Sequence, residues 1–158
     1  MQLDKKQLTQ LLQFKDENII SRFSDMYQIE EEEINDILQE TLKFLYISQI
    51  PGVFIPDELL VLDEMWHNLI LFTPLYHQLS EQYLNADYFH HIPASKKEKE
   101  VRTLKMQNDP KTAKEEYAKK LEFLLTVIYE HLGEETVIKW FRDYPKKYSK
   151  ERLKLIRK

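Results

Sequence analysis

Two polar side chains, Asp63 and His67, stand in the middle of the apolar face expected for a helix at residues 57–72. The apolar residues of this segment recur at helical spacing, and two residues four apart on a helix project from the same face within mutual reach. An unpaired carboxylate in an apolar environment is costly, and a buried imidazole needs a partner for its ring N–H. We therefore expect both side chains to be mostly buried and hydrogen-bonded, with Glu64 and Asn68 on the opposite face.

Three interpretations of this pair stay open. Asp63 and His67 can form a purely structural hydrogen-bonded pair. They can bind a metal ion together with further histidines, because imidazole and carboxylate groups are ligands of zinc and iron. Asp63 can also orient His67 for acid–base catalysis. The sequence assigns no catalytic residue, so whether the chain is an enzyme also stays open.

The distribution of the histidines favours the metal interpretation. Four of the five lie between residues 67 and 91. A Thr-Pro corner at residues 73–74 would allow the loop that carries His90 and His91 to return towards His67. We predict a zinc or iron site with the ligands His67, His90, His91 and Asp63. Three residues would orient these ligands from outside the coordination sphere, namely Trp66, Tyr76 and His77.

The elements that position these residues are expected to be helices. Only two glycines occur among 158 residues, and helix-favouring Leu, Glu and Lys are abundant. The absence of cysteine excludes disulfides and thiolate metal sites. Residues 95–108 are expected to be a polar, partly helical connection. The pattern predicts an all-α fold, an irregular bundle of about seven helices at residues 4–14, 16–27, 30–46, 57–72, 73–85, 110–132 and 134–143.

Charge is unevenly distributed along the chain. Residues 1–65 hold 14 acidic and 5 basic residues, whereas residues 66–158 hold 13 acidic and 18 basic ones. We interpret residues 1–145 as a single helical domain and residues 146–158 as a solvated basic tail, dispensable for folding. No nucleic-acid partner is expected. The N-terminus lacks the apolar core of a signal peptide, and no apolar run reaches the ~20 residues of a membrane span. We therefore expect a cytoplasmic protein with no membrane partner.

The region from about residue 40 to residue 93 resembles a family of uncharacterised proteins. Its members include small bacterial proteins and the N-terminal region of plant glycine-rich-domain-containing proteins. The shared pattern is Asp-x-x-Trp-His, a downstream Tyr and a closing His-His-x-Pro, found here at Asp63, Trp66, His67, Tyr76, His90, His91 and Pro93. The glycine-rich segment has no counterpart in this chain. The resemblance implies no established reaction, but it implies that the Asp and His positions belong together.

The leading hypothesis is thus a helical protein of unestablished activity whose Asp/His cluster forms one site that binds a metal ion. The alternative is a protein-interaction module with a protein partner, for example an immunity or inhibitor protein that binds a toxin or an enzyme. The small size, the helical composition and the acidic N-terminal half are compatible with that alternative.

Overall fold

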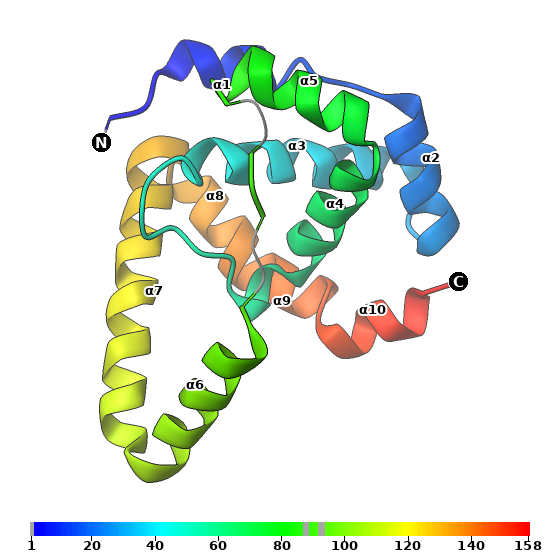
Figure 1. The fold of residues 1–158 in the computed structure, drawn as a ribbon. Helices are drawn as coiled ribbons and strands as arrows, with labels where there is room; N and C mark the ends of the chain where they lie inside the picture. The colour runs from blue at the N-terminus through cyan, green and yellow to red at the C-terminus, as the bar shows by residue number, and fades with distance from the viewer. Residues whose placement is uncertain (1, 87–88, 92–93) are drawn as a thin grey trace.

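The computed structural model describes residues 2–86, 89–91 and 94–158. Within these ranges helices are the only regular secondary structure, apart from one isolated β-bridge between Tyr27 and Arg157. The all-α class is confirmed, with more helices than predicted (Figure 1). The helices are α1 (Lys5–Leu11), α2 (Glu17–Met26), α3 (Glu31–Ile47), η1 (Asp57–Leu59), α4 (Leu60–Leu71), α5 (Thr73–Tyr83), α6 (Lys96–Asn108), α7 (Pro110–Leu132), α8 (Glu134–Ile138), η2 (Lys139–Asp143), α9 (Tyr144–Lys147) and α10 (Lys150–Ile156). Among the described residues, none of these helices combines the length and the apolar character needed to cross a bilayer.

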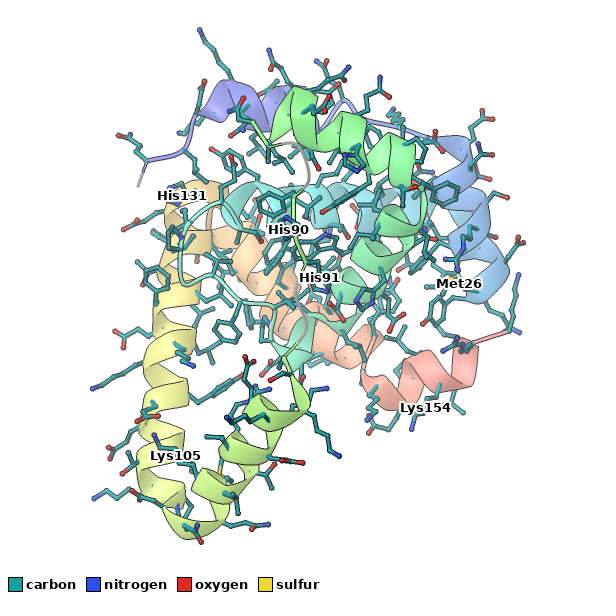
Figure 2. The ribbon with its side chains drawn as sticks, in the orientation of Figure 1. Met26, His90, His91, Lys105, His131 and Lys154 are labelled. Atoms are coloured by element: carbon teal, nitrogen blue, oxygen red, sulfur yellow. The ribbon has the colours of Figure 1, made fainter. Side chains whose placement is uncertain are left out.

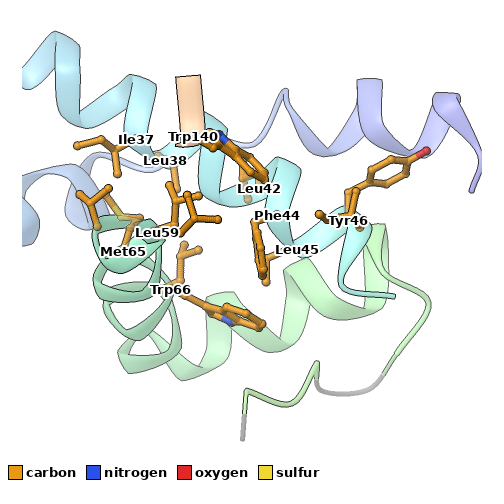
Figure 3. Packing of buried hydrophobic residues seen from close by; sticks show 14 of the residues in the cluster. Ile37, Leu38, Leu42, Phe44, Leu45, Tyr46, Leu59, Met65, Trp66 and Trp140 are labelled. Atoms are coloured by element: carbon orange, nitrogen blue, oxygen red, sulfur yellow. The ribbon is translucent and has the colours of Figure 1, made fainter. Parts of the chain in front are cut away.

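Helix α3 is the central element, and it packs against α1, α2, α4 and α7. Most of its residues are buried, whereas most helices of the protein bury only a few. Its Phe44 ring lies 6.1 Å from the ring of Trp66 in α4 and 5.8 Å from that of Trp140 in η2 (Figure 3). These two aromatic contacts join α3 and α4 in the middle of the chain to its C-terminal part, and they support α4 next to the candidate site.

Several helix boundaries follow the signals in the sequence. Asp109 accepts a hydrogen bond from the backbone N–H of Thr112 and precedes Pro110 at the start of α7. Gly133, with φ of +95°, ends the same helix in a conformation that favours glycine. Thr73 differs from the prediction, because it lies inside α5 and makes no capping hydrogen bond.

The segment expected to be a partly helical connection is a regular helix, α6. Ser95 accepts from the backbone N–H of Glu98, and the Glu98 carboxylate accepts from the N–H of Ser95. This reciprocal capping box satisfies two backbone donors at the start of the helix. The capping box explains why so polar a segment begins a helix at this residue.

The prediction that the last bundle helix ends at residue 143, just before Tyr144 and Pro145, is wrong. The helical path continues to Lys147 through η2, a π-helical turn in which the N–H of Tyr144 donates to the carbonyl of Lys139. A proline clashes with the carbonyl four residues earlier in an ordinary α-helix, and the wider π turn relieves that clash.

The C-terminal segment is not a solvated tail. Tyr148 and Leu153 are buried in the main hydrophobic cluster. The backbone carbonyl of Ile156 accepts from the N–H of Gln28, and the N–H of Lys158 donates to the carbonyl of Met26. The basic side chains of residues 146–158 obscure this packing in the sequence, because only Tyr148 and Leu153 of this segment are buried and most of the residues around them are exposed.

Candidate metal site

Three of the predicted ligands meet at one point. Asp63 and His67 lie on α4, and His91 lies in the loop after α5, where Figure 2 shows it beside α4. His91 Nε2 is 2.9 Å from Asp63 Oδ1 and 3.1 Å from His67 Nε2. His67 Nδ1 is 3.8 Å from Asp63 Oδ2. One ligand atom from each residue therefore lies within 4.8 Å of the other two.

The burial of these side chains differs from the prediction. Asp63 is 23% exposed and His67 is 49% exposed, so the expectation that both are mostly buried is wrong for His67 and holds only in part for Asp63. His91, from the loop, is 9% exposed and is the most buried of the three. The site is therefore a partly solvated cluster at the surface of the core, with its deepest member outside α4.

The reason lies in the composition of α4, which is apolar on nearly all sides. Its buried face contains Val61, Leu62, Met65 and Leu69 and lies away from Asp63. The spacing of apolar residues shows how a helix is rotated about its own axis only when one face is clearly more apolar than the other. In α4 no face is clearly more apolar than the rest, so the spacing does not define the rotation of this helix. Asn68, predicted to face solvent, is only 1% exposed.

Asn68 fixes the rotation of α4 about its axis. Its side-chain N–H donates to the backbone carbonyl of Ile19 at 2.9 Å, and its Oδ1 accepts from Arg22 Nη1 at 2.7 Å. Both partners lie on α2, so the amide ties the two helices together. This turns Asp63 and His67 towards the loop that carries His91. An amide within an apolar run is a weak signal, so this role of Asn68 was not predicted from the sequence.

A chain of hydrogen bonds holds the loop in place. The indole N–H of Trp66 donates to the hydroxyl of Tyr76 at 2.9 Å, and that hydroxyl donates to the carbonyl of Phe89 at 2.5 Å. The N–H of Phe89 donates to Ser80 Oγ at 3.1 Å. The backbone is thus anchored to α5 two residues before His91. Ser80 was not among the predicted site residues.

Ring packing adds a second constraint on His91. Its imidazole lies against the indole of Trp66, with ring centroids 4.1 Å apart, and 4.8 Å from the ring of His67. The indole is itself buried, so the imidazole rests on a fixed surface. Trp66 therefore contacts His91 by its ring face and supports the loop by its N–H.

Two predicted residues lie outside the cluster. His90 is exposed and lines the cleft beside the site, but it contributes no atom to the group formed by Asp63, His67 and His91. His77 is exposed on α5 and lies outside the lining of the cleft at the site. Pro93, the last position of the family-like pattern, lies outside the described residues.

The three side chains open into a cleft of about 570 Å³. Lys99 and Arg102 of α6 also line it. Its apolar lining comes from α3, α4 and the segments around residues 54 and 89, namely Phe44, Val53, Phe54, Ile55, Trp66 and Phe89. A ligand at the cluster would thus be reachable from solvent. The cleft combines apolar walls with charges of both signs.

No protein-family model, curated protein or solved structure matches this chain. The resemblance to the uncharacterised family therefore stays a prediction, and the arguments below depend on the geometry of the site.

Proposed function

We propose that this helical protein binds one transition metal ion, zinc or iron, through Asp63, His67 and His91. The observation that carries the proposal is the convergence of one carboxylate oxygen and two imidazole nitrogens on a common point. Carboxylate and imidazole are ligands that both metals accept. The coarser description, a helical protein with an Asp/His cluster, does not depend on the proposal.

Two of the three separations between the donor atoms are close to those in a metal centre, and all three atoms lie within 4.8 Å of one another. Ligand atoms 2.0–2.1 Å from a tetrahedral ion are about 3.3–3.4 Å from each other. Two separations in the cluster are 2.9 and 3.1 Å, so a few tenths of an ångström of outward movement would admit an ion. Side-chain torsions can supply that movement without displacing α4.

Hydrogen bonding alone accounts for the cluster less well. His91 Nε2 approaches both an oxygen of Asp63 and a nitrogen of His67, yet a ring nitrogen carries at most one proton. One N–H shared between two acceptors makes at least one poorly directed bond. A cation accepts a lone pair from each of the three atoms, so every member of the cluster is satisfied.

Three protein ligands leave at least one coordination position for water or a small molecule. Structural zinc sites generally have four protein ligands, whereas catalytic ones keep an open position. The exposure of His67 and the adjoining cleft give solvent access to that position. The proposal is therefore an accessible metal site, and it assigns no reaction.

The test is zinc titration of metal-free, untagged protein by calorimetry, together with thermal melting. We expect about one equivalent to bind and to raise the melting temperature, because a ligand that binds only the native state stabilises it. Binding should weaken as the pH falls through the histidine range, since a protonated imidazole cannot ligate.

Two neighbouring variants give a matched comparison. His91→Ala should weaken zinc binding by at least tenfold, whereas His90→Ala, one residue away in the same loop, should leave the affinity within about twofold. Equal losses in the two variants would refute the assignment of ligands. No saturable binding, with no melting shift in excess zinc, would leave the cluster as a structural hydrogen-bonded group.

A further inference from the structure

Helix α6 is unusual because none of its 13 residues is buried. Its apolar side chains Val101 and Leu104 are each 55% exposed, and Met106 is 45% exposed. Among the described helices, α6 has substantial contacts only with α7, and in Figure 1 the two helices form a hairpin that projects from the bundle. Helices in proteins gain most of their stability by packing an apolar face, so this hairpin leaves such a face without cover.

Of these three exposed side chains, Met106 lines a groove of about 730 Å³ between α6, α7 and the connector around residues 52–54, together with the half-exposed rings of Tyr117 and Phe123 on α7. The ring of Phe54 meets that of Tyr117 edge-on, with centroids 6.1 Å apart. The connector also lies close against Phe123, since a Cβ at Gly52 would be 3.0 Å from that ring. Three chain segments therefore build the groove, and its apolar lining is formed by aromatic residues already packed on each other.

The rim of this α6–α7 groove is basic. Arg102, Lys105, Lys119 and Lys120 line it, and the one acidic residue of the lining, Glu116, is paired with Lys105 at 2.6 Å. Residues 96–120 hold nine basic and five acidic residues, a net charge of +4, in a chain whose net charge is −4. A segment of net positive charge thus borders the apolar groove (Lys105 is labelled in Figure 2).

We propose that the α6–α7 groove is a docking site for an acidic amphipathic helix of a protein partner. The apolar side chains of that helix would enter the groove, and its carboxylates would face the basic rim. An exposed apolar surface with a charged border is typical of an interaction site. The proposal is independent of the metal site, although Val53, Phe54 and Arg102 line both the groove and the cleft.

The shape and the rest of the chain favour this occupant over others. A bilayer surface suits a convex amphipathic face, whereas this lining is concave. A second copy of the chain has an acidic half, residues 1–65, but no large apolar side chain of residues 2–65 is exposed. That half therefore offers carboxylates without the apolar anchors that a groove of this kind would bind.

The test uses a synthetic helical peptide of about 18 residues, with Leu and Phe at positions i, i+4 and i+7 and Glu elsewhere. Its binding to the full chain is measured by fluorescence anisotropy. We expect saturable binding that weakens with added salt. A peptide with the same apolar pattern but Lys in place of Glu should bind at least tenfold more weakly.

The double variant Lys119→Glu/Lys120→Glu should weaken binding of the acidic peptide at least tenfold, and as both positions are exposed it should fold. Lys154→Glu, on α10 outside the groove (Figure 2), is the matched control and should bind like the original chain. The proposal is overturned if the acidic peptide does not bind, or if both peptides bind equally. It is also overturned if anionic phospholipid vesicles bind at the groove in place of the peptide. The same holds if the chain self-associates through the groove, so that the double variant abolishes the self-association.

Discussion

The substitution Tyr76→Phe tests whether the hydrogen-bonded chain behind the cluster positions His91. It removes one oxygen atom and keeps the ring. The hydroxyl accepts from the indole N–H of Trp66 at 2.9 Å and donates to the carbonyl of Phe89 at 2.5 Å. Without it the indole N–H is left in a buried environment, and of the two hydrogen bonds that anchor Phe89 to α5 the one from its N–H to Ser80 remains.

The expected loss of stability follows from these two bonds. A buried donor left without a partner costs about 1–3 kcal/mol. The carbonyl of Phe89 lies in a part-buried loop that water can reach. Loss of its hydrogen bond from Tyr76 therefore adds about 1 kcal/mol or less. The total of about 1–4 kcal/mol corresponds to a fall of roughly 2–16 °C in melting temperature for a chain of this size.

The same substitution should weaken zinc binding by about 10- to 100-fold, the usual effect of removing a group that orients a metal ligand. Urea unfolding and calorimetric zinc titration measure the two effects separately. Tyr129→Phe is the control, because that tyrosine is 60% exposed on α7. If Tyr76→Phe matches this control in both measurements, the chain of hydrogen bonds does not position the loop.

Three further substitutions or truncations test the fold around the site. Asn68→Ala should cost about 2–3 kcal/mol in urea unfolding, because it removes the two hydrogen bonds that the amide donates to the Ile19 carbonyl and accepts from Arg22; a cost below 0.5 kcal/mol would show that this amide does not hold α4 in place. Truncation after Pro145 should lower the stability by about 3 kcal/mol or more through lost apolar burial, and an unchanged thermal transition would restore the prediction of a dispensable tail. Burial raises the pKa of Glu33, but hydrogen bonds, first among them that from Lys147, outweigh this and hold the pKa below the ordinary 4.5. The carboxylate therefore stabilises the protein above about pH 4.5 and loses this effect as the pH falls through its lower folded pKa, so the stability difference from Glu33→Gln should shrink between pH 7 and pH 3.

The helical class and several helix ends could be predicted because their causes are local. Asp109, Pro110 and Gly133 act on the backbone within one turn, so the start and end of α7 can be read from adjacent residues. The start of α6 could have been predicted in the same way, since Ser95 and Glu98 have the spacing of a capping box. The high charge of the segment led to the expectation of a partly helical connection.

The orientation of the site could be predicted only in part. The spacing of Asp63 and His67 is local, and it places them together on α4 whatever that helix packs against. The rotation of α4 depends on contacts between Asn68 and α2, which lie more than 40 residues away in the chain. Long-range contacts of this kind leave no periodic pattern in the sequence.

The choice between the two adjacent histidines has a similar origin. The sequence pairs His90 with His91, and nothing in their neighbours separates them. The structure separates them through the anchoring of Phe89 to α5 and the packing of His91 on Trp66. The position of a histidine in a loop depends on where the loop is anchored to the rest of the fold. Those anchors are tertiary contacts, which the neighbouring sequence does not show.

The most direct test of the metal proposal is anomalous diffraction at the zinc edge from crystals grown with one equivalent of zinc. We expect a single anomalous peak about 2.0–2.2 Å from a carboxylate oxygen of Asp63 and from Nε2 of both His67 and His91. A peak bound by His90 instead, or zinc only at scattered surface positions while this cluster keeps its hydrogen bonds, would contradict the proposal.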